Sequence, residues 1–215
     1  MTEQNFDQMR YAMVVSQLRT TGVSDARVVA AMGAVPREAF VPADKSSLAY
    51  LDIAIPLGGG RALNAPMVTG RLLTEAGIEP GEKVLLVGAA TGYTAALLAK
   101  LGADVVAVEV DADLAAQGEA AAPKTVKWAR GALAAGSHDG APYDLVVIDG
   151  AVEHIPQAII DQLADGGRLV GAIVDRGVTR LVTGVRAGKG FGTRSFADVD
   201  AVILPGFAKP VGFSF

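Results

Sequence analysis

Short apolar runs alternate with amphipathic stretches from residue 83 onward. The unbroken apolar run at 84–87, between Gly81 and Gly88, is typical of a parallel strand that is covered on both faces. Further strands are predicted at 104–109, 125–129, 144–148 and 168–174, and helices at 92–101, 112–121 and 156–163. This alternation predicts an α/β fold, doubly wound around a mostly parallel sheet.

The pattern differs at both ends of the chain. Residues 3–18 have the spacing of an amphipathic helix, and a second helix can be capped by Ser24 or Asp25 and is ended by Pro36. The glycines at 58–60 predict a loop that leads to a helix beginning near Pro66. After residue 178, two apolar stretches joined through 188–190 predict a closing antiparallel strand pair. We therefore expect one domain over 1–215, with an N-terminal helical segment (1–80) and a Rossmann-like core (81–215).

Composition narrows the class of function. The 215 residues are 51% apolar and 20% charged, with a formal charge of −4, which favours a compact protein that binds small molecules or peptides rather than nucleic acid or membranes. The absence of cysteine excludes thiolate catalysis, and two isolated histidines predict no metal site. The first residues lack the apolar core of a signal peptide, so the expected location is the cytoplasm.

A glycine turn follows the strand at 83–87. Gly88 and Gly92 permit a tight turn and close approach of a ligand, and Tyr93 can stack on an adenine ring. Glu109 ends the next strand, where nucleotide-binding folds place a carboxylate that accepts hydrogen bonds from ribose hydroxyls. The spacing lacks the middle glycine of the dinucleotide motif, which favours a smaller adenosine ligand such as S-adenosylmethionine. The alternative is a glycine turn that only packs a helix onto a strand.

Asp149 follows the strand at 144–148. Open α/β sheets place ligand-binding groups at the carboxyl ends of their strands, so Asp149 is a candidate ligand contact. The alternative is a carboxylate that caps a helix or stabilises a loop. Arg37 and Glu38, in the segment before Pro42, are expected to pair with each other and hold the N-terminal segment in place.

Four blocks of sequence resemble the protein-L-isoaspartate O-methyltransferases along almost the whole chain. They are MVVSQLRTTGVSDARVVAAMGAVPREAFVP, AYLDIAIPLGGGRALNAPMV, KVLLVGAATGY and APYDLVVIDGAVEHIPQAIIDQLADGGRLV. The resemblance implies a seven-stranded S-adenosylmethionine-dependent methyltransferase fold whose N-terminal segment helps to form a peptide site. It also implies cofactor contacts at Gly88, Gly92 and Glu109, and an isoaspartyl peptide or another carboxylate as methyl acceptor.

The chain departs from the family pattern at four functional positions. Leu86 replaces an acidic residue near the cofactor's amino group, and Ala90 replaces a glycine of the turn. Ala132 replaces an aspartate that contacts adenine, so adenine recognition there would rest on backbone groups. Asn64 stands in the active-site segment where the family has a hydroxyl residue, and its amide can still donate to a carboxylate. We therefore assign Asn64 the catalytic position and Ala132 a place in the cofactor site.

Two functions follow from these observations. The first is an active carboxyl O-methyltransferase of the protein-repair type that uses S-adenosylmethionine. The second is a protein that keeps the fold but has lost the reaction and serves as a binding or scaffold module, because the functional positions depart together.

Overall fold

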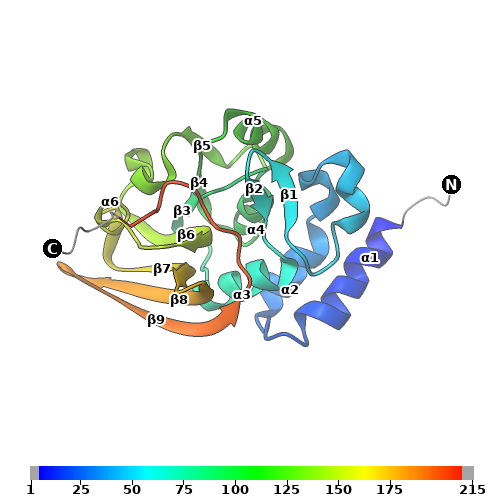
Figure 1. Ribbon diagram of the computed structural model, residues 1–215, viewed down its shortest axis with the longest axis horizontal. Coiled ribbons are helices and arrows are strands. Elements are labelled where there is room, and N and C mark those ends of the chain that lie inside the picture. The colour runs from blue at the N-terminus through cyan, green and yellow to red at the C-terminus, as the bar shows by residue number, and fades with distance from the viewer. Residues whose placement is uncertain (1–4, 210–215) are drawn as a thin grey trace.

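The computed structural model describes residues 5–209. Seven strands in this part of the chain form one twisted sheet in the order β5-β4-β3-β6-β7-β8-β9 (Figure 1). Neighbouring strands from β5 to β7 are parallel, and β8 and β9 continue the sheet as antiparallel strands. The strands are Lys83–Val87 (β3), Asp104–Glu109 (β4), Lys127–Arg130 (β5), Tyr143–Val152 (β6), Leu163–Asp175 (β7), Val178–Ala187 (β8) and Gly190–Val199 (β9). The predicted fold class is therefore confirmed, including the closing antiparallel pair.

Helices and short helical turns occupy the connections. The α-helices are Phe6–Met13 (α1), Ala26–Ala34 (α2), Pro66–Ala76 (α3), Tyr93–Lys100 (α4), Ala112–Ala121 (α5) and Gln157–Ile160 (α6). A π-helical turn, Val14–Leu18, continues α1, and 3₁₀ helices lie at Arg37–Phe40, Ala43–Leu48, Leu133–Ala135 and His138–Gly140. A separate antiparallel hairpin is formed by Ile55–Gly58 (β1) and Arg61–Leu63 (β2).

Three predicted elements differ from the observed ones. The helix predicted at 156–163 is a single turn, α6, because the chain enters β7 at Leu163. The loop predicted around 58–60 is the tip of the β1–β2 hairpin, since three glycines with positive φ let the chain reverse there. The helix predicted over 3–18 changes from α to π at Val14, and its first two residues lie outside the described part.

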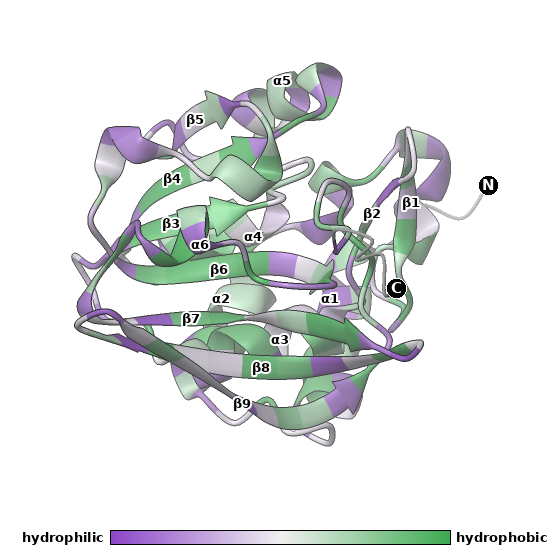
Figure 2. Ribbon diagram, turned by 60° about the vertical axis from the view of Figure 1, so that its left-hand side comes forward, coloured by the Kyte–Doolittle hydropathy of each residue, from purple (hydrophilic) through white to green (hydrophobic). Residues whose placement is uncertain are grey.

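The two faces of the sheet are covered by different kinds of structure. One face packs against the N-terminal helices and α3 and α4, through alternate strand residues such as Leu86 and Val147. The other face, with Val87 and Ile148, packs against the 3₁₀ turn at 133–135, α6 and the segment after β9 (Figure 2). One apolar cluster includes residues from both 1–80 and 81–215, and the single domain stays a prediction.

The order of the strands locates the site. The chain runs from β3 outward to β4 and β5, then returns to place β6 on the other side of β3. The connections from β3 and β6 therefore leave the sheet in opposite directions at the carboxyl end of these two neighbouring strands. Ligands of open α/β sheets bind at such a switch point.

The N-terminal segment is tied down differently from the prediction. Glu38 pairs with Arg10, at 3.0 Å, and accepts a hydrogen bond from the Tyr50 hydroxyl, whereas its predicted partner Arg37 binds other groups. The fully buried Arg37 guanidinium donates instead to the carbonyl oxygens of Ala49, at 2.8 Å, and Asn64, at 2.6 Å. Burial lowers the pKa of Arg37. Arg37 thus fixes the backbone that carries Asn64.

Candidate functional site

The turn after β3 is held against β4 by its backbone. The amides of Gly88 and Ala89 donate to the carbonyl oxygen of Val108, at 3.0 and 3.1 Å. Gly88 and Gly92 have φ values of 81° and 91°, which glycine adopts without steric cost. Ala90, which has a Cβ, also has a positive φ of 49°. The alanine is therefore accommodated in the turn at the cost of some backbone strain.

Glu109 lies at the carboxyl end of β4, as predicted, and its side chain is fully buried. Its Oε2 accepts from the amide of Ala90 at 2.6 Å, and its Oε1 accepts from the amides of Val110 and Asp111 at 3.0 and 3.1 Å. These bonds join the carboxylate to the glycine turn. The turn and the acid that the sequence singled out are thus brought together.

Arg61 is a residue of this site that the sequence interpretation missed. Its guanidinium comes from β2 and pairs with Glu109, with Nη2 2.7 Å from Oε2 and Nε 3.3 Å from Oε1. Both side chains are excluded from solvent. The one available signal was a lone arginine directly after the three glycines, and such a residue in a loop is ordinarily solvated.

Asp149 and Asn64 form a second buried cluster at the switch point. Asn64 Nδ2 donates to Asp149 Oδ1 at 2.9 Å and to its carbonyl oxygen at 3.1 Å, and Thr94, in the first turn of α4, donates to Oδ2 at 2.5 Å. Burial raises the pKa of Asp149, although these hydrogen bonds oppose the shift. Asn64 Oδ1 accepts from the amide of Val202 at 2.9 Å. The predicted catalytic amide therefore already links β6 to the segment after β9, and its catalytic role stays a prediction.

The segment 201–207 crosses the carboxyl edge of the sheet (Figure 1). The amide of Ala151 donates to the carbonyl oxygen of Val202 at 2.7 Å, and the amide of Leu204 donates to the carbonyl oxygen of Ala151 at 2.9 Å. A Cβ built on Gly88 would lie only 2.9 Å from a methyl carbon of Leu204, so Leu204 covers the glycine turn. Beside it lies a hollow of about 150 Å³, which is lined by Val110, Ala132, Leu133, Ala134, Pro205 and Gly206.

The aromatic candidates lie in packed surroundings. The fully buried ring of Tyr93 contacts Phe40, with 5.7 Å between the ring centroids, and the Arg37 guanidinium lies 4.7 Å from its centroid. Trp128 packs over Gly118, where an added Cβ would lie 2.1 Å from the indole. The cofactor contact predicted for Tyr93 stays a prediction, and its ring faces the N-terminal segment.

These residues can be tested for fit to an adenosine ligand. The glycine turn, the buried Glu109 carboxylate and the first turn of α4 supply the groups that a ribose and a ligand chain require. Glu109, however, is engaged by Arg61, and the hollow beside Ala132 is smaller than the roughly 300–1,000 Å³ of typical ligand pockets. The residues therefore fit the ligand once Arg61 and Leu204 have moved.

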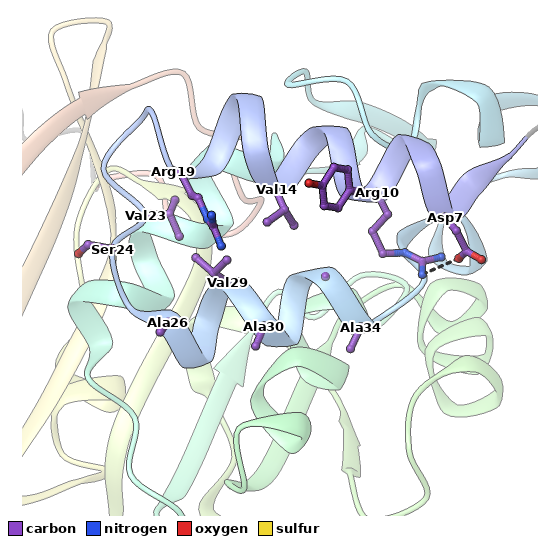
Figure 3. A pocket seen from close by; sticks show the side chains of 12 residues that line it. Asp7, Arg10, Val14, Arg19, Val23, Ser24, Ala26, Val29, Ala30 and Ala34 are labelled. Carbon is purple, nitrogen blue, oxygen red and sulfur yellow. Dashed lines mark hydrogen bonds and ion pairs between the residues drawn. The ribbon is translucent and has the colours of Figure 1, made fainter.

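A larger groove lies away from this edge. It has a volume of about 800 Å³ and runs between α1 with its π-helical turn and α2 (Figure 3). Asp7 and Arg10 lie at one end of it, and Arg19 and Ser24 at the other. None of the predicted site residues lines it, so the groove is separate from the switch point.

Comparisons with known proteins agree with this geometry. The family model for protein-L-isoaspartate(D-aspartate) O-methyltransferase matches residues 9–199. Protein-L-isoaspartate O-methyltransferases from Methylorubrum populi and Methylorubrum extorquens are 38% and 39% identical over 202 and 212 residues. These matches cover 92% and 94% of this chain, and 95% and 92% of the relatives.

Solved structures show the same fold. A protein-L-isoaspartate O-methyltransferase has a TM-score of 0.78 at 21% identity, and the match covers 93% of this chain and 66% of that one. A Plasmodium falciparum protein described as a beta-aspartate methyltransferase, solved with S-adenosyl-L-homocysteine, has a TM-score of 0.77 at 19% identity, covering 94% of this chain and 99% of that one.

Within residues 5–209, no helix has the length and apolar composition that a membrane span requires. The matched relatives cover both the N-terminal segment that carries Arg61 and the sheet that carries Glu109. From this coverage, and from the seven-stranded fold it shares with solved relatives, it follows that the chain belongs to the protein-L-isoaspartate(D-aspartate) O-methyltransferase family.

Proposed function

We propose that this protein is an S-adenosylmethionine-dependent carboxyl O-methyltransferase that acts on isoaspartyl residues of damaged proteins or peptides. The observation that carries the proposal is the buried Glu109 carboxylate, joined to the glycine turn at the switch point of a chain of this family. The comparisons give no support to the alternative of a scaffold that has lost the reaction.

The reaction asks for alignment more than for acid–base catalysis. When bound, the cofactor supplies an activated methyl group on a sulfonium, and the acceptor carboxylate is already an anionic nucleophile. The protein must then hold the two reactants in line and exclude water. The scarcity of histidine is compatible with this chemistry.

We assign roles to the residues at this edge. Glu109 accepts hydrogen bonds from the ribose hydroxyls, and Gly88 and Gly92 let the ligand approach the turn. The backbone at Ala132 borders the adenine position, and Tyr93 supports the turn from the core. Asp149, at the end of β6, is assigned to the cofactor's side of the site. Its buried charge would attract the sulfonium or ammonium group of the cofactor.

Asn64 is assigned to the acceptor side of the site. Its amide lies between Asp149 and the backbone of Val202, so it is positioned by both the sheet and the segment 201–207. To donate to an acceptor carboxylate it must give up its bond to Asp149. The exchange would keep the number of bonds that Asn64 donates, whereas the buried Asp149 Oδ1 would lose one donor, at a cost of about 1–3 kcal/mol.

Transfer of a labelled methyl group tests the proposal. The protein is incubated with methyl-labelled S-adenosylmethionine at millimolar concentration and an isoaspartyl peptide, with the matching aspartyl peptide as control. We expect a base-labile methyl ester on the isoaspartyl peptide alone. The proposal is contradicted if transfer does not exceed that of heat-inactivated protein. Equal labelling of both peptides would retain the reaction class and contradict the assigned substrate.

A further inference from the structure

The buried pair of Arg61 and Glu109 places a cation of the protein where the proposed ligand has to bind. Glu109 accepts two hydrogen bonds from Arg61 and one each from the amides of Ala90, Val110 and Asp111. An ionised carboxylate offers about four lone-pair positions, so these five donors leave no acceptor capacity for ribose hydroxyls. A ribose can bind Glu109 only after the arginine has left.

A neighbouring side chain closes the same space. Leu204 lies over Gly88, and Arg61 Nη2 would be 3.5 Å from a Cβ built on this glycine. The two side chains therefore stand on the surface of the turn that the ligand would approach. Gly88 has no side chain, and Arg61 and Leu204 fill the room that this provides.

Arg61 belongs to an element that is not hydrogen-bonded into the seven-stranded sheet. The β1–β2 hairpin forms its own two-stranded sheet, and an isolated hairpin is only marginally stable. Its base is buried at Ile55 and Leu63, whereas Gly58, Gly59 and Gly60 at its tip are exposed. The side chain of Arg61 thus connects the glycine-rich tip of the hairpin to the most buried carboxylate of the site.

We propose that Arg61 is an internal competitor of the cofactor: it occupies Glu109 in the ligand-free protein and has to swing out with the hairpin tip before the ribose can bind. This inference rests on the proposed function and adds a gate to its site. The apparent dissociation constant of a ligand equals the intrinsic one divided by the fraction of protein that is open. Removing the guanidinium should therefore tighten binding without adding a contact.

The test uses calorimetric titration with S-adenosylhomocysteine, which needs no methyl acceptor. Arg61→Gln should bind it at least ~10-fold more tightly than the wild type, because the open fraction rises toward one. Arg180→Gln is the matched control, since it removes an arginine from an exposed ion pair with Asp198 on β8 and β9. The control should bind as the wild type does. Equal or weaker binding by Arg61→Gln would overturn the proposal.

A rate measurement on the wild type guards against a variant that folds poorly. If Arg61 must leave first, the observed rate of binding in stopped flow should reach a plateau as S-adenosylhomocysteine increases. A rate that rises linearly throughout would overturn the proposal, as would a failure of both the wild type and Arg61→Gln to bind.

The outcomes separate this inference from the proposed function. Methyl transfer by the wild type together with unchanged affinity in Arg61→Gln refutes the gate and leaves the function standing. Tighter binding by Arg61→Gln without methyl transfer by either protein supports the gate and refutes the function.

Discussion

Replacing Arg168 by alanine should lower the free energy of unfolding by about 3 kcal/mol at pH 7. Arg168 lies on β7, where it pairs with Leu145 of β6. This is the end of the parallel strands opposite to the site. Its guanidinium donates to both oxygens of Glu82, each at 2.7 Å, and to the carbonyl oxygens of Ala76 and Gly77, at 2.5 and 2.9 Å. The last two are carbonyls at the C-terminus of α3, which have no partner within the helix.

The magnitude follows from these four bonds. A hydrogen bond between charged groups contributes about 1.5–3 kcal/mol, and one to a carbonyl about 1 kcal/mol. A quarter of the arginine side chain and a fifth of the Glu82 side chain are exposed, so water replaces part of the loss and the lower values apply. Because the four bonds share one guanidinium, their contributions are not additive, and we expect about 3 kcal/mol rather than the sum of about 4–5 kcal/mol. For a chain of this size, about 3 kcal/mol corresponds to a fall in Tm of ~6–12 °C.

The ion pair of Arg168 with Glu82 should also make this loss of stability depend on pH. Hydrogen bonds from Arg168 hold the pKa of Glu82 below its usual 4.5. An acid whose pKa is lowered by folding stabilises the folded state above its unfolded pKa and loses this contribution as the pH falls. The deficit of Arg168→Ala should therefore be smaller at pH 3.5 than at pH 7.

Urea unfolding at both pH values measures this prediction, with a double-mutant cycle that adds Glu82→Gln. Arg194→Ala is the matched control, because its ion pair with Glu75 has the same 2.7 Å distance but the arginine side chain is 67% exposed. The control should stay within about 0.5 kcal/mol of the wild type. A loss below about 1 kcal/mol in Arg168→Ala, or the same loss at both pH values, would refute the reasoning.

Three further predictions concern the site and its support. Glu109→Ala should abolish detectable titration with S-adenosylhomocysteine, and normal binding would remove Glu109 from the ribose position. Burial raises the pKa of Asp149, so the wild type loses stability as this carboxyl ionises between pH 4 and pH 7. The unfolding free energy of Asp149→Asn should therefore rise relative to that of the wild type over this range, and a constant difference would contradict this. Gly118→Ala should lose more than about 2 kcal/mol in urea unfolding, since its Cβ would meet Trp128 at 2.1 Å, and a smaller loss would mean that the indole moves freely.

Local patterns were sufficient to predict the sheet and the positions of the glycine turn and of Glu109 at the ends of their strands. The strand at 83–87 follows from one apolar run, and Gly88 and Glu109 follow from their spacing, because each signal lies within a short stretch. Arg61 and Leu204 could not be predicted in this way, since Arg61 meets Glu109 across 48 residues of sequence and Leu204 meets the turn from beyond β9. Their positions depend on how the hairpin and the segment 201–207 pack, which no periodicity encodes.

The crossing of segment 201–207 over the sheet has a consequence for synthesis. Leu204 and Phe207 are buried on the face that carries Val87 and Ile148, yet they follow all seven strands in the chain. While a ribosome is still making β9, that face remains partly uncovered and Leu204 is not yet in place over Gly88. The nascent sheet is therefore exposed to misassociation until these last residues emerge, and the site is completed only after translation has passed them.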